Sequence, residues 1–519
     1  MRRVLVIGAG MGGLAAAVDL ARAGCRVTVL ERAAGPGGKL REVMVGGGAN
    51  GDPGTAGPGD ACPGIDGGPT VFTMRAVFES LFADAGARLE ERLPLVPADL
   101  LARHAWREGG RLDLFADVER SASAIGDFAG ADDARAFRDF HARSGGLHDA
   151  LRHSFMEAQR PSPAELVARL GVRGLGAMWR TAPWRTLWQT LGAQFRDPRL
   201  RQLYSRYATY VGSSPLAAPA TLMLIAHVEQ QGVWLVQGGM RRIALALETL
   251  GEEQGADYRY DAHVARLVVR ERRVSGVVLD SGEEIAADAV VFNGDISALG
   301  SGALGAELRG ALPVTAPRDR ALSAVTWCLR APTRGFPLAH HTVFFGDDYP
   351  DEFDAVFRRR TVSRAPTVYV CAQDRDASAA AALRDGLTEG AAERLLLLVN
   401  APADGDRGGI DDATLDRIGD DAFGLMRDCG FVVGDGSVAA RQGGVVTRPQ
   451  DWERLFPATG GSLYGRANHG ALGSFQRPGA ASGVPGLYLA GGSVHPGPGV
   501  PMATLSGRLA AARLLADAV

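Results

Sequence analysis

The feature that most constrains the fold of this chain is a glycine-rich turn that follows a short apolar strand near the N-terminus. Residues 4–7 (VLVI) predict a buried strand, and the pattern G-x-G-x-x-G follows at Gly8, Gly10 and Gly13. In such a unit the first glycine permits a tight turn, the second lets a pyrophosphate approach the backbone, and the third lets helix and strand pack closely. The helix-compatible run that comes next would offer free N–H groups and a positive dipole end to phosphates. The sequence therefore predicts a dinucleotide-binding βαβ unit.

A carboxylate at the end of the second strand supports this prediction. Gly24 ends the helical run, and a second apolar strand, residues 26–30, leads directly to Glu31. A carboxylate there accepts hydrogen bonds from ribose hydroxyls and disfavours a 2′-phosphate by charge repulsion. The residues expected at the nucleotide in this unit are Gly8, Ala9, Gly10, Met11, Gly12, Gly13, Glu31 and Arg32.

A second copy of the glycine pattern, residues 300–305 (GSGALG), lacks this context. The residues before it, 295–299, do not read as a buried strand, and no later strand ends in an acid. We interpret this copy as a surface turn.

The segment after Glu31 favours FAD over NAD. It contains Gly37, Gly38 and Lys39. The whole pattern resembles the N-terminal signature of FAD-dependent amine oxidases, phytoene desaturases and their relatives. In that superfamily the Gly-Gly-basic segment passes close to the pyrophosphate and ribityl chain of the flavin. The resemblance therefore implies FAD as the cofactor and adds Gly38, Lys39 and Leu40 to the expected site.

Composition limits the classes of function. The chain has 519 residues, 46% hydrophobic and 22% charged, as expected for a soluble protein of two or three compact units. A net charge of −3 gives no support for nucleic-acid binding. The five cysteines show no CxxC spacing, so we expect neither a disulfide framework nor a metal site, and a reducing cytoplasm is the simplest compartment.

The N-terminus resembles a signal peptide, because Met-Arg-Arg precedes an apolar run. Cleavage would destroy the nucleotide turn, and Asp19 interrupts the run, so we expect no secretion. No stretch approaches the roughly 20 apolar residues that a membrane span needs.

The rest of the chain divides into segments of different pattern. Residues 46–64 are nearly all Gly, Pro, Ala and Asp, which is typical of a mobile loop. Periodicity predicts that residues 75–235 are mainly helical, residues 258–288 alternate as in a β-meander, and a mixed α/β region is expected from about 320 to 480. Further strand candidates are 342–345, 367–371, 395–399 and 487–490, and a terminal helix is expected at 502–517.

The N-terminal βαβ unit must be completed by strands from far along the chain, and residues 258–295 and 487–490 are the candidates. We therefore expect an α/β fold with a discontinuous FAD-binding Rossmann-type domain, an inserted α+β substrate domain and a mainly helical, membrane-facing region. The expected boundaries are 1–100, 236–300 and 481–519 for the FAD domain, 101–235 for the helical region and 301–480 for the substrate domain.

Motifs outside the nucleotide turn carry a narrower resemblance. They are residues 66–70, 195–199, 210–215, 238–240, 293–295 and 486–501. In sequence and order they resemble the signatures of bacterial phytoene-desaturase-type carotenoid desaturases. Residues 68–74 (GPTVFTM) and 489–507 are most similar to the branch of 1-hydroxycarotenoid 3,4-desaturases, which includes methoxyneurosporene dehydrogenase.

This resemblance implies further cofactor residues. Pro69 and Thr70 would lie near the isoalloxazine, and the backbone of Val264 would meet the adenine. Gly491 and Gly492 would face the pyrophosphate and ribityl chain. A last group would place the N-terminus of the terminal helix under the flavin pyrimidine ring, where its dipole stabilises negative charge: Val500, Pro501, Met502 and Ala503.

The implied reaction removes two hydrogens from an acyclic carotenoid, with hydride transfer to flavin N5, and the branch implies 3,4-desaturation of a 1-hydroxycarotenoid. Because no side chain accepts a hydride, the cofactor carries this chemistry and the protein positions a long apolar chain. The sequence identifies no catalytic side chain. Four polar candidates, Asp66, Arg466, His469 and His495, each have a structural explanation that is at least as good. His340 and His341 are interpreted as polarity at a strand edge rather than as metal ligands.

The expected substrate dissolves in lipid, so we expect a cytoplasmic protein peripherally associated with the inner membrane. Residues 179–188, rich in Trp and Arg, are the candidate interfacial helix, and a core helix is an equally compatible interpretation. Oxygen or a quinone is the expected electron acceptor.

Other functions on the same fold stay open. They are a phytoene or neurosporene desaturase, a carotenoid isomerase or oxygenase, a flavin amine oxidase, and a non-catalytic carrier of prenylated partners. An amine oxidase would need an aromatic pair in the C-terminal motif, which has Pro498, Pro501 and Met502 instead.

Overall fold

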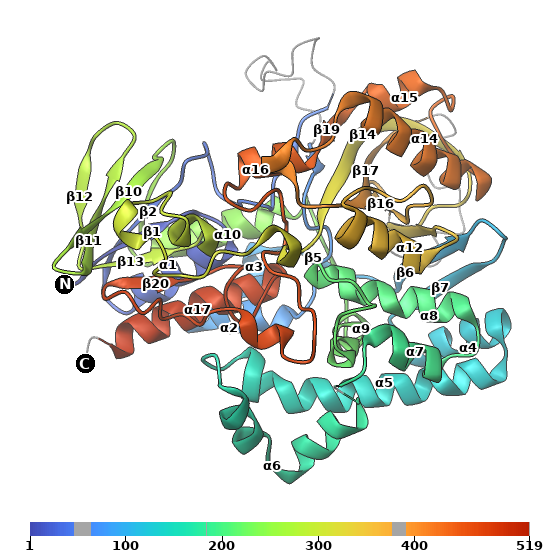
Figure 1. Cartoon of the computed structure of the whole chain (residues 1–519), viewed down its shortest axis with the longest axis horizontal. Helices are drawn as coiled ribbons and strands as arrows, with labels where there is room; N and C mark the ends of the chain where they lie inside the picture. Colours follow the sequence, from blue (N-terminus) through green and yellow to red (C-terminus); the bar gives the residue numbers. More distant parts are fainter. Residues whose placement is uncertain (46–63, 183, 376–390, 518–519) are drawn as a thin grey trace.

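The computed structural model describes residues 1–45, 64–182, 184–375 and 391–517. The loop predicted at 46–64 therefore lies outside the described residues, except for Gly64. Figure 1 shows a parallel sheet with its helices on one side of the molecule, a large mixed sheet on the other, and a group of helices below the mixed sheet.

The first sheet has five parallel strands that come from three distant parts of the chain. Its order is β20-β13-β1-β2-β9. The strands are β1 (Arg3–Ile7), β2 (Arg26–Leu30), β9 (Asp257–Arg259), β13 (Ala289–Phe292) and β20 (Leu487–Leu489). The prediction that segments near 258–295 and 487–490 complete the βαβ unit is therefore confirmed. The second glycine pattern, residues 300–305, begins at the last residue of the short helix α11 (Ile296–Gly300). As expected, it does not follow a strand.

Alternate side chains of this sheet enter two different cores. Val4 and Val6 of β1 pack with the helices on one face, whereas Leu5 packs with the antiparallel strands on the other. The helices are α1 (Met11–Arg22), α2 (Arg75–Asp84), α10 (Arg241–Glu253) and α17 (Val500–Ala516). The antiparallel strands are β10 (Val264–Arg270), β11 (Arg273–Leu279) and β12 (Glu284–Ala286). Coverage of both faces explains why the strands are apolar at consecutive positions.

The second sheet has eight strands, and its main path is β18-β14-β17-β16-β15-β6-β7, with β19 paired to β14. It contains β6 (Leu100–Trp106), β7 (Arg111–Phe115), β14 (Ser323–Gly335), β15 (His341–Phe345), β16 (Val368–Ala372), β17 (Ala392–Ala401), β18 (Phe431–Val433) and β19 (Val445–Thr447). The three strand candidates between residues 342 and 399 are therefore confirmed. Helix α14 (Asp412–Asp428) shares a core with this sheet.

The prediction that residues 75–235 are mainly helical is wrong for 95–115. This stretch forms β5 (Leu95–Pro97) and the hairpin β6–β7, which extends the second sheet. All seven residues of β6 are buried, so the strand lacks the alternation of polar and apolar residues by which a strand is recognised. The domain boundaries stay a prediction.

The remaining helices lie mostly below the second sheet (Figure 1). They are α4 (Val118–Ala129), α5 (Ala131–Leu151), α6 (Pro163–Arg180), α7 (Leu187–Gln194), α8 (Pro198–Ser205) and α9 (Leu224–Gln230), with the short helices η1 (Arg152–Met156) and η2 (Arg206–Val211). The prediction of one interfacial helix at 179–188 is wrong, because that segment is the end of α6, a turn and the start of α7.

Short elements connect these parts. They are β3 (Glu42–Val43), β4 (Ile65–Asp66), β8 (Trp234–Val236), α3 (Leu89–Arg92), α12 (Tyr349–Asp354), α15 (Val438–Gln442) and α16 (Pro449–Leu455). None of the helices in the described part of the chain has the length and apolarity to cross a bilayer.

Candidate functional site

One cavity of about 1430 Å³ brings the predicted cofactor residues together. Every residue predicted at the flavin lines it except Ala9 and Gly13. Gly13 instead lies behind the turn, where a Cβ atom would stand 2.0 Å from the carbonyl oxygen of Gly8. This contact explains why the third glycine is required for close packing of α1 on β1.

Two helices begin at the wall of this cavity. Gly10 is the N-cap of α1 and Gly499 the N-cap of α17, and neither helix has a side-chain cap or an acidic residue in its first turn. The first N–H groups of an α-helix have no partner within the helix, and the dipole gives this end a partial positive charge. Both helix ends are therefore suited to a bound anion such as a pyrophosphate.

Glu31 fixes the shape of the turn around the predicted nucleotide. Its Oε2 accepts a hydrogen bond from the backbone N–H of Ala9 at 2.7 Å, and its Oε1 accepts one from Ala33 at 2.9 Å. A carboxylate oxygen can accept more than one hydrogen bond, so both oxygens keep capacity for ribose hydroxyls. Arg32 lines the rim of the cavity, and its guanidinium donates to the carbonyl oxygens of Arg454 and Leu455.

Asn293 is a site residue whose role the sequence did not reveal. It follows β13, and its Nδ2 donates to the carbonyl oxygen of Gly8 at 3.1 Å. A Cβ atom on Gly10 would have this Nδ2, at 3.0 Å, as its nearest neighbour, whereas one on Gly12 would stand 2.6 Å from Oδ1. Asn293 therefore holds the glycine turn from the side of the neighbouring strand. The only signal in the sequence was its place in the motif at 293–295.

Two cations, the half-buried Lys39 and the buried Arg477, stand near each other at the cavity. Lys39 lines it, and its Nζ donates to the carbonyl oxygen of Leu463 at 2.5 Å. Burial lowers the pKa of Lys39 to about 8, against the opposing effect of Asp295. Arg477, only 1% exposed, donates to the carbonyl oxygen of Gly492 at 2.9 Å, and burial lowers its pKa to about 10. Sequence reasoning missed Arg477, which holds the turn after β20.

These residues fit a flavin dinucleotide. Two uncapped helix ends are available for the phosphates, a carboxylate for a ribose, and glycines where a side chain would fill the space. Val264 lines the same cavity, and Pro69 and Thr70 border the part of it that continues beyond the nucleotide residues.

That continuation is mostly apolar. It reaches between η1 and α6 on one side and between α9 and β17 on the other. The apolar residues that line it include Leu151, Phe155, Met156, Leu166, Met178, Leu222, Leu224, Ile225, Val228, Leu396 and Leu398. A long hydrocarbon is the kind of ligand that such walls bind.

The polar candidates from the sequence have structural partners. The Nε2 of His495 is 2.9 Å from the carbonyl oxygen of Phe155 and 3.0 Å from that of Ala158, and burial lowers the pKa of this imidazole to about 4. Asp66 accepts a hydrogen bond from the N–H of Met240 at 2.8 Å, ahead of α10. Neither residue lines the cavity, so the structure supports the structural explanation for both.

Arg466 and His469 also lie outside the cavity wall. Arg466 forms an ion pair with Asp319 at 3.4 Å, and the Nε2 of His469 accepts a hydrogen bond from the N–H of Ser214 at 3.0 Å. The structure therefore supports the structural explanation for both residues.

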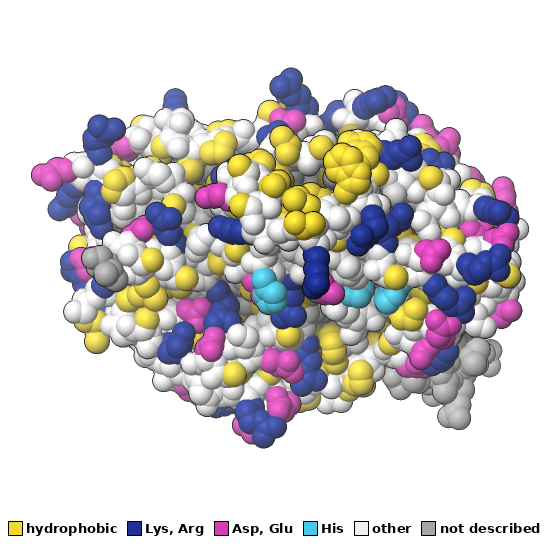
Figure 2. Space-filling model, turned by 90° about the horizontal axis from the view of Figure 1, so that it is seen from below, with side chains coloured by type: hydrophobic (Ala, Val, Ile, Leu, Met, Phe, Trp, Pro, Cys, Tyr) yellow, Lys and Arg dark blue, Asp and Glu magenta, His cyan; other side chains and the backbone are white. Residues whose placement is uncertain are grey.

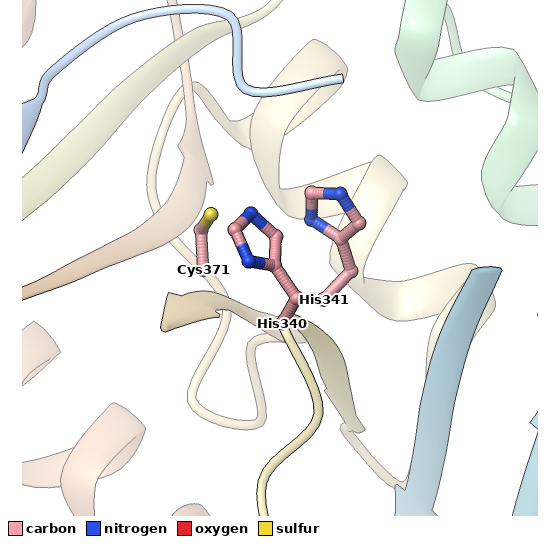
Figure 3. A group of neighbouring side chains, drawn as sticks. All are labelled: His340, His341 and Cys371. Atoms are coloured by element: carbon pink, nitrogen blue, oxygen red, sulfur yellow. The ribbon is translucent and has the colours of Figure 1, made fainter. Parts of the chain in front are cut away.

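The strand-edge interpretation of His340 and His341 is wrong. His341 begins β15, an inner strand between β16 and β6, and it is 4% exposed. Figure 3 shows both imidazoles beside the thiol of Cys371, and their possible ligand atoms lie within 4.8 Å of one another. However, the Nδ1 of His341 is hydrogen-bonded to the Tyr369 hydroxyl at 2.7 Å. Burial also raises the pKa of the Cys371 thiol to about 12. A neutral thiol is a poor ligand, so a site without metal stays our prediction.

The fold and this site define a flavoprotein oxidoreductase. The sequence matches the family of flavin containing amine oxidoreductases over residues 11–325 and 426–515, so the chain belongs to that family, and FAD is its cofactor. The structure is similar to that of a triple mutant of putrescine oxidase, with a TM-score of 0.58 and 15% identity over 99% of both chains, which shows the shared fold.

Two relatives are similar over nearly the whole chain. A protein of Rubrivivax gelatinosus described as hydroxyneurosporene desaturase is 50% identical over 515 residues, covering 99% of this chain and 93% of the relative. A protein of Cereibacter sphaeroides with the same description is 44% identical over 520 residues, covering 99% and 98%.

Proposed function

We propose that the protein is an FAD-dependent carotenoid desaturase that removes two hydrogens from an acyclic carotenoid, at the C3–C4 bond of a 1-hydroxycarotenoid. The observation that carries this proposal is the continuity of one cavity from the nucleotide residues to the apolar walls at α9 and β17. The similarity to two hydroxyneurosporene desaturases supports the substrate class.

The chemistry divides between cofactor and chain. When bound, FAD supplies the hydride acceptor, which no side chain can provide. The chain supplies apolar walls that exclude water and hold a long substrate in one orientation. The uncapped N-terminus of α17, at Gly499 and Val500, favours negative charge on a group bound beside it.

A feeding experiment tests this function. We expect expression in bacteria that supply 1-hydroxyneurosporene to give a product with one more conjugated double bond, because desaturation extends the polyene, and we expect a red shift of the pigment absorbance. The same cells without the gene are the control. A shift with phytoene alone would identify a phytoene desaturase, and a change of isomer without net oxidation would identify an isomerase.

We also propose peripheral association with the inner membrane from the cytoplasm, with α6 at the lipid. Figure 2 shows hydrophobic side chains gathered on the face where α6 lies. The exposed ones in and after α6 are Val167 (49%), Val172 (90%), Trp179 (72%) and Trp184 (57%). Arg173, Arg180 and Arg185 are exposed in the same stretch. The inner side of α6 lines the cavity through Leu166 and Met178, so a substrate in lipid would have a short path to it.

We expect the purified protein to sediment with anionic liposomes, and Trp179→Ala with Trp184→Ala to weaken this by roughly tenfold or more, because indoles bind at headgroup depth. Val438→Ala with Val445→Ala removes exposed apolar side chains elsewhere and is the control. Unchanged sedimentation of the tryptophan variant would contradict this orientation.

Oxygen or a quinone stays the proposed electron acceptor, and anaerobic turnover with added quinone would distinguish them.

A further inference from the structure

A charged group stands in the apolar part of the cavity. Arg206, the first residue of η2, lines the wall together with Leu222, Leu224 and Leu398. Its Nη1 donates to the hydroxyl of Tyr210 at 3.1 Å. The guanidinium carbon lies 5.1 Å from the ring centre of Tyr210 and 5.4 Å from that of Tyr369. The proposed hydrocarbon chain gives no reason for a cation at this place.

The surrounding residues fix the position and charge of this guanidinium. The Tyr210 hydroxyl donates to Oε1 of Glu229 at 2.9 Å, and the Tyr207 hydroxyl donates to Oε2. Glu229 is 5% exposed and lines the same wall. Burial by itself lowers the pKa of Arg206, but Tyr210, Glu229 and Tyr369 outweigh it, so the net shift is upward. Arg206 is therefore held as a cation in one orientation.

Part of this guanidinium is free to bind a ligand. Within the described part of the chain, no acceptor bonds to Nε or Nη2 of Arg206, and neither nitrogen is sealed from the cavity. An N–H donor that faces apolar walls without a hydrogen-bond acceptor costs free energy. A ligand that brings one oxygen acceptor to this point would remove that cost, and a pure hydrocarbon would increase it by displacing water.

The guanidinium also lies close to the expected reaction site. The hydroxyl of Tyr369, whose ring it faces, is 2.7 Å from Oγ1 of Thr70, the residue implied to lie near the isoalloxazine. In a 1-hydroxycarotenoid, C2 alone separates the oxygen-bearing C1 from the reacting C3. A residue that binds this oxygen must therefore lie beside the reacting carbons, and the contact of Arg206 with the ring of Tyr369, itself bonded to Thr70, agrees with this requirement.

We propose that Arg206, positioned by Tyr210 and Glu229, binds the oxygen atom on C1 of the substrate and selects oxygenated over unoxygenated chain ends. This inference rests on the proposed function and adds the subsite that recognises the substrate. Arginine only donates hydrogen bonds, so an ether oxygen serves as well as a hydroxyl. We therefore expect a 1-methoxy carotenoid to bind with a Kd within about threefold of that of the 1-hydroxy compound.

The test compares FAD-loaded wild type and Arg206→Met on 1-hydroxyneurosporene and on neurosporene, which have the same carbon skeleton. We expect kcat/KM for the hydroxylated substrate to fall roughly 10- to 100-fold, the value of a hydrogen bond to a charged group, and kcat/KM for neurosporene to stay the same or rise, because methionine leaves no unpaired donor in the wall. Arg206→Lys keeps a donor and should recover part of the loss. The matched control is Arg196→Met, where the side chain is 80% exposed and outside the cavity.

Equal losses on both substrates would show a structural role and overturn the inference. If Arg206→Met does not retain flavin, Tyr210→Phe decides in the same way, since it removes only the hydroxyl that positions the guanidinium. A wild-type protein that holds FAD and desaturates neither substrate would contradict the proposed function. A wild type that desaturates both, with a selectivity that the variants leave unchanged, would contradict only the role of Arg206.

Discussion

Replacing Gly10 by valine should leave the protein folded but unable to hold FAD. The backbone of Gly10 has φ −76° and ψ 174°, an extended conformation that valine adopts without strain. A Cβ atom there would have the Nδ2 of Asn293, at 3.0 Å, as its nearest neighbour, and the rest of the side chain would occupy the cavity that the pyrophosphate needs. We expect affinity for FAD to fall roughly 100-fold or more, about 2.7 kcal/mol.

Flavin absorbance of the purified protein and its titration with FAD measure this loss, and circular dichroism checks the fold. Gly146→Val is the matched control, because Gly146 is exposed on α5 and a Cβ atom there has no neighbour within 4 Å. Unaltered flavin content in Gly10→Val would show that the dinucleotide binds elsewhere, and the assignment of this site would be wrong.

The second large effect is expected where the first and last helices meet. Gly507 of α17 packs on Gly12 of α1, and a Cβ atom on Gly507 would stand 2.0 Å from the carbonyl oxygen of Gly12. Because a backbone atom cannot move away alone, Gly507→Leu must separate the two helices. We expect a loss of stability of about 3 kcal/mol, at the upper end of the range for overpacked cores, and loss of FAD because the N-terminus of α17 shifts.

Thermal unfolding with and without FAD measures both effects. Gly146→Leu adds the same side chain to an exposed helical position and should leave the unfolding temperature nearly unchanged. An unfolding temperature for Gly507→Leu equal to that of the wild type would show that α1 and α17 do not approach as closely as described.

The βαβ unit could be predicted residue by residue because its signals are local. The apolar strand, the glycines and Glu31 lie within 31 residues, and the close contact that requires glycine at Gly13 is made with the nearby carbonyl oxygen of Gly8. The terminal strand and helix were predictable for the same reason. Resemblance then added Val264 and residues 500–503, and the structure places them on the same cavity.

Other parts were decided by contacts between distant segments. Strand β6 is buried at every position, so its sequence carries no period, and only its pairing with β7 and β15 defines it as a strand. His340 and His341 resembled exposed polarity, but their strand lies inside a sheet. Asn293 bonds to Gly8, which is 285 positions away, and Arg477 bonds to Gly492 across a turn, through hydrogen bonds that no spacing rule encodes.

The dinucleotide site at the N-terminal turn could be predicted from the sequence alone, because the backbone geometry for phosphate binding is encoded in adjacent residues. The residues that lie opposite that turn are known only from the folded structure. Arg206, Glu229 and Tyr369 come from η2, α9 and β16, and they meet because burial of apolar surface brings these elements together around one cavity. A polar group in an apolar wall has no local signature, since its meaning depends on which residues face it.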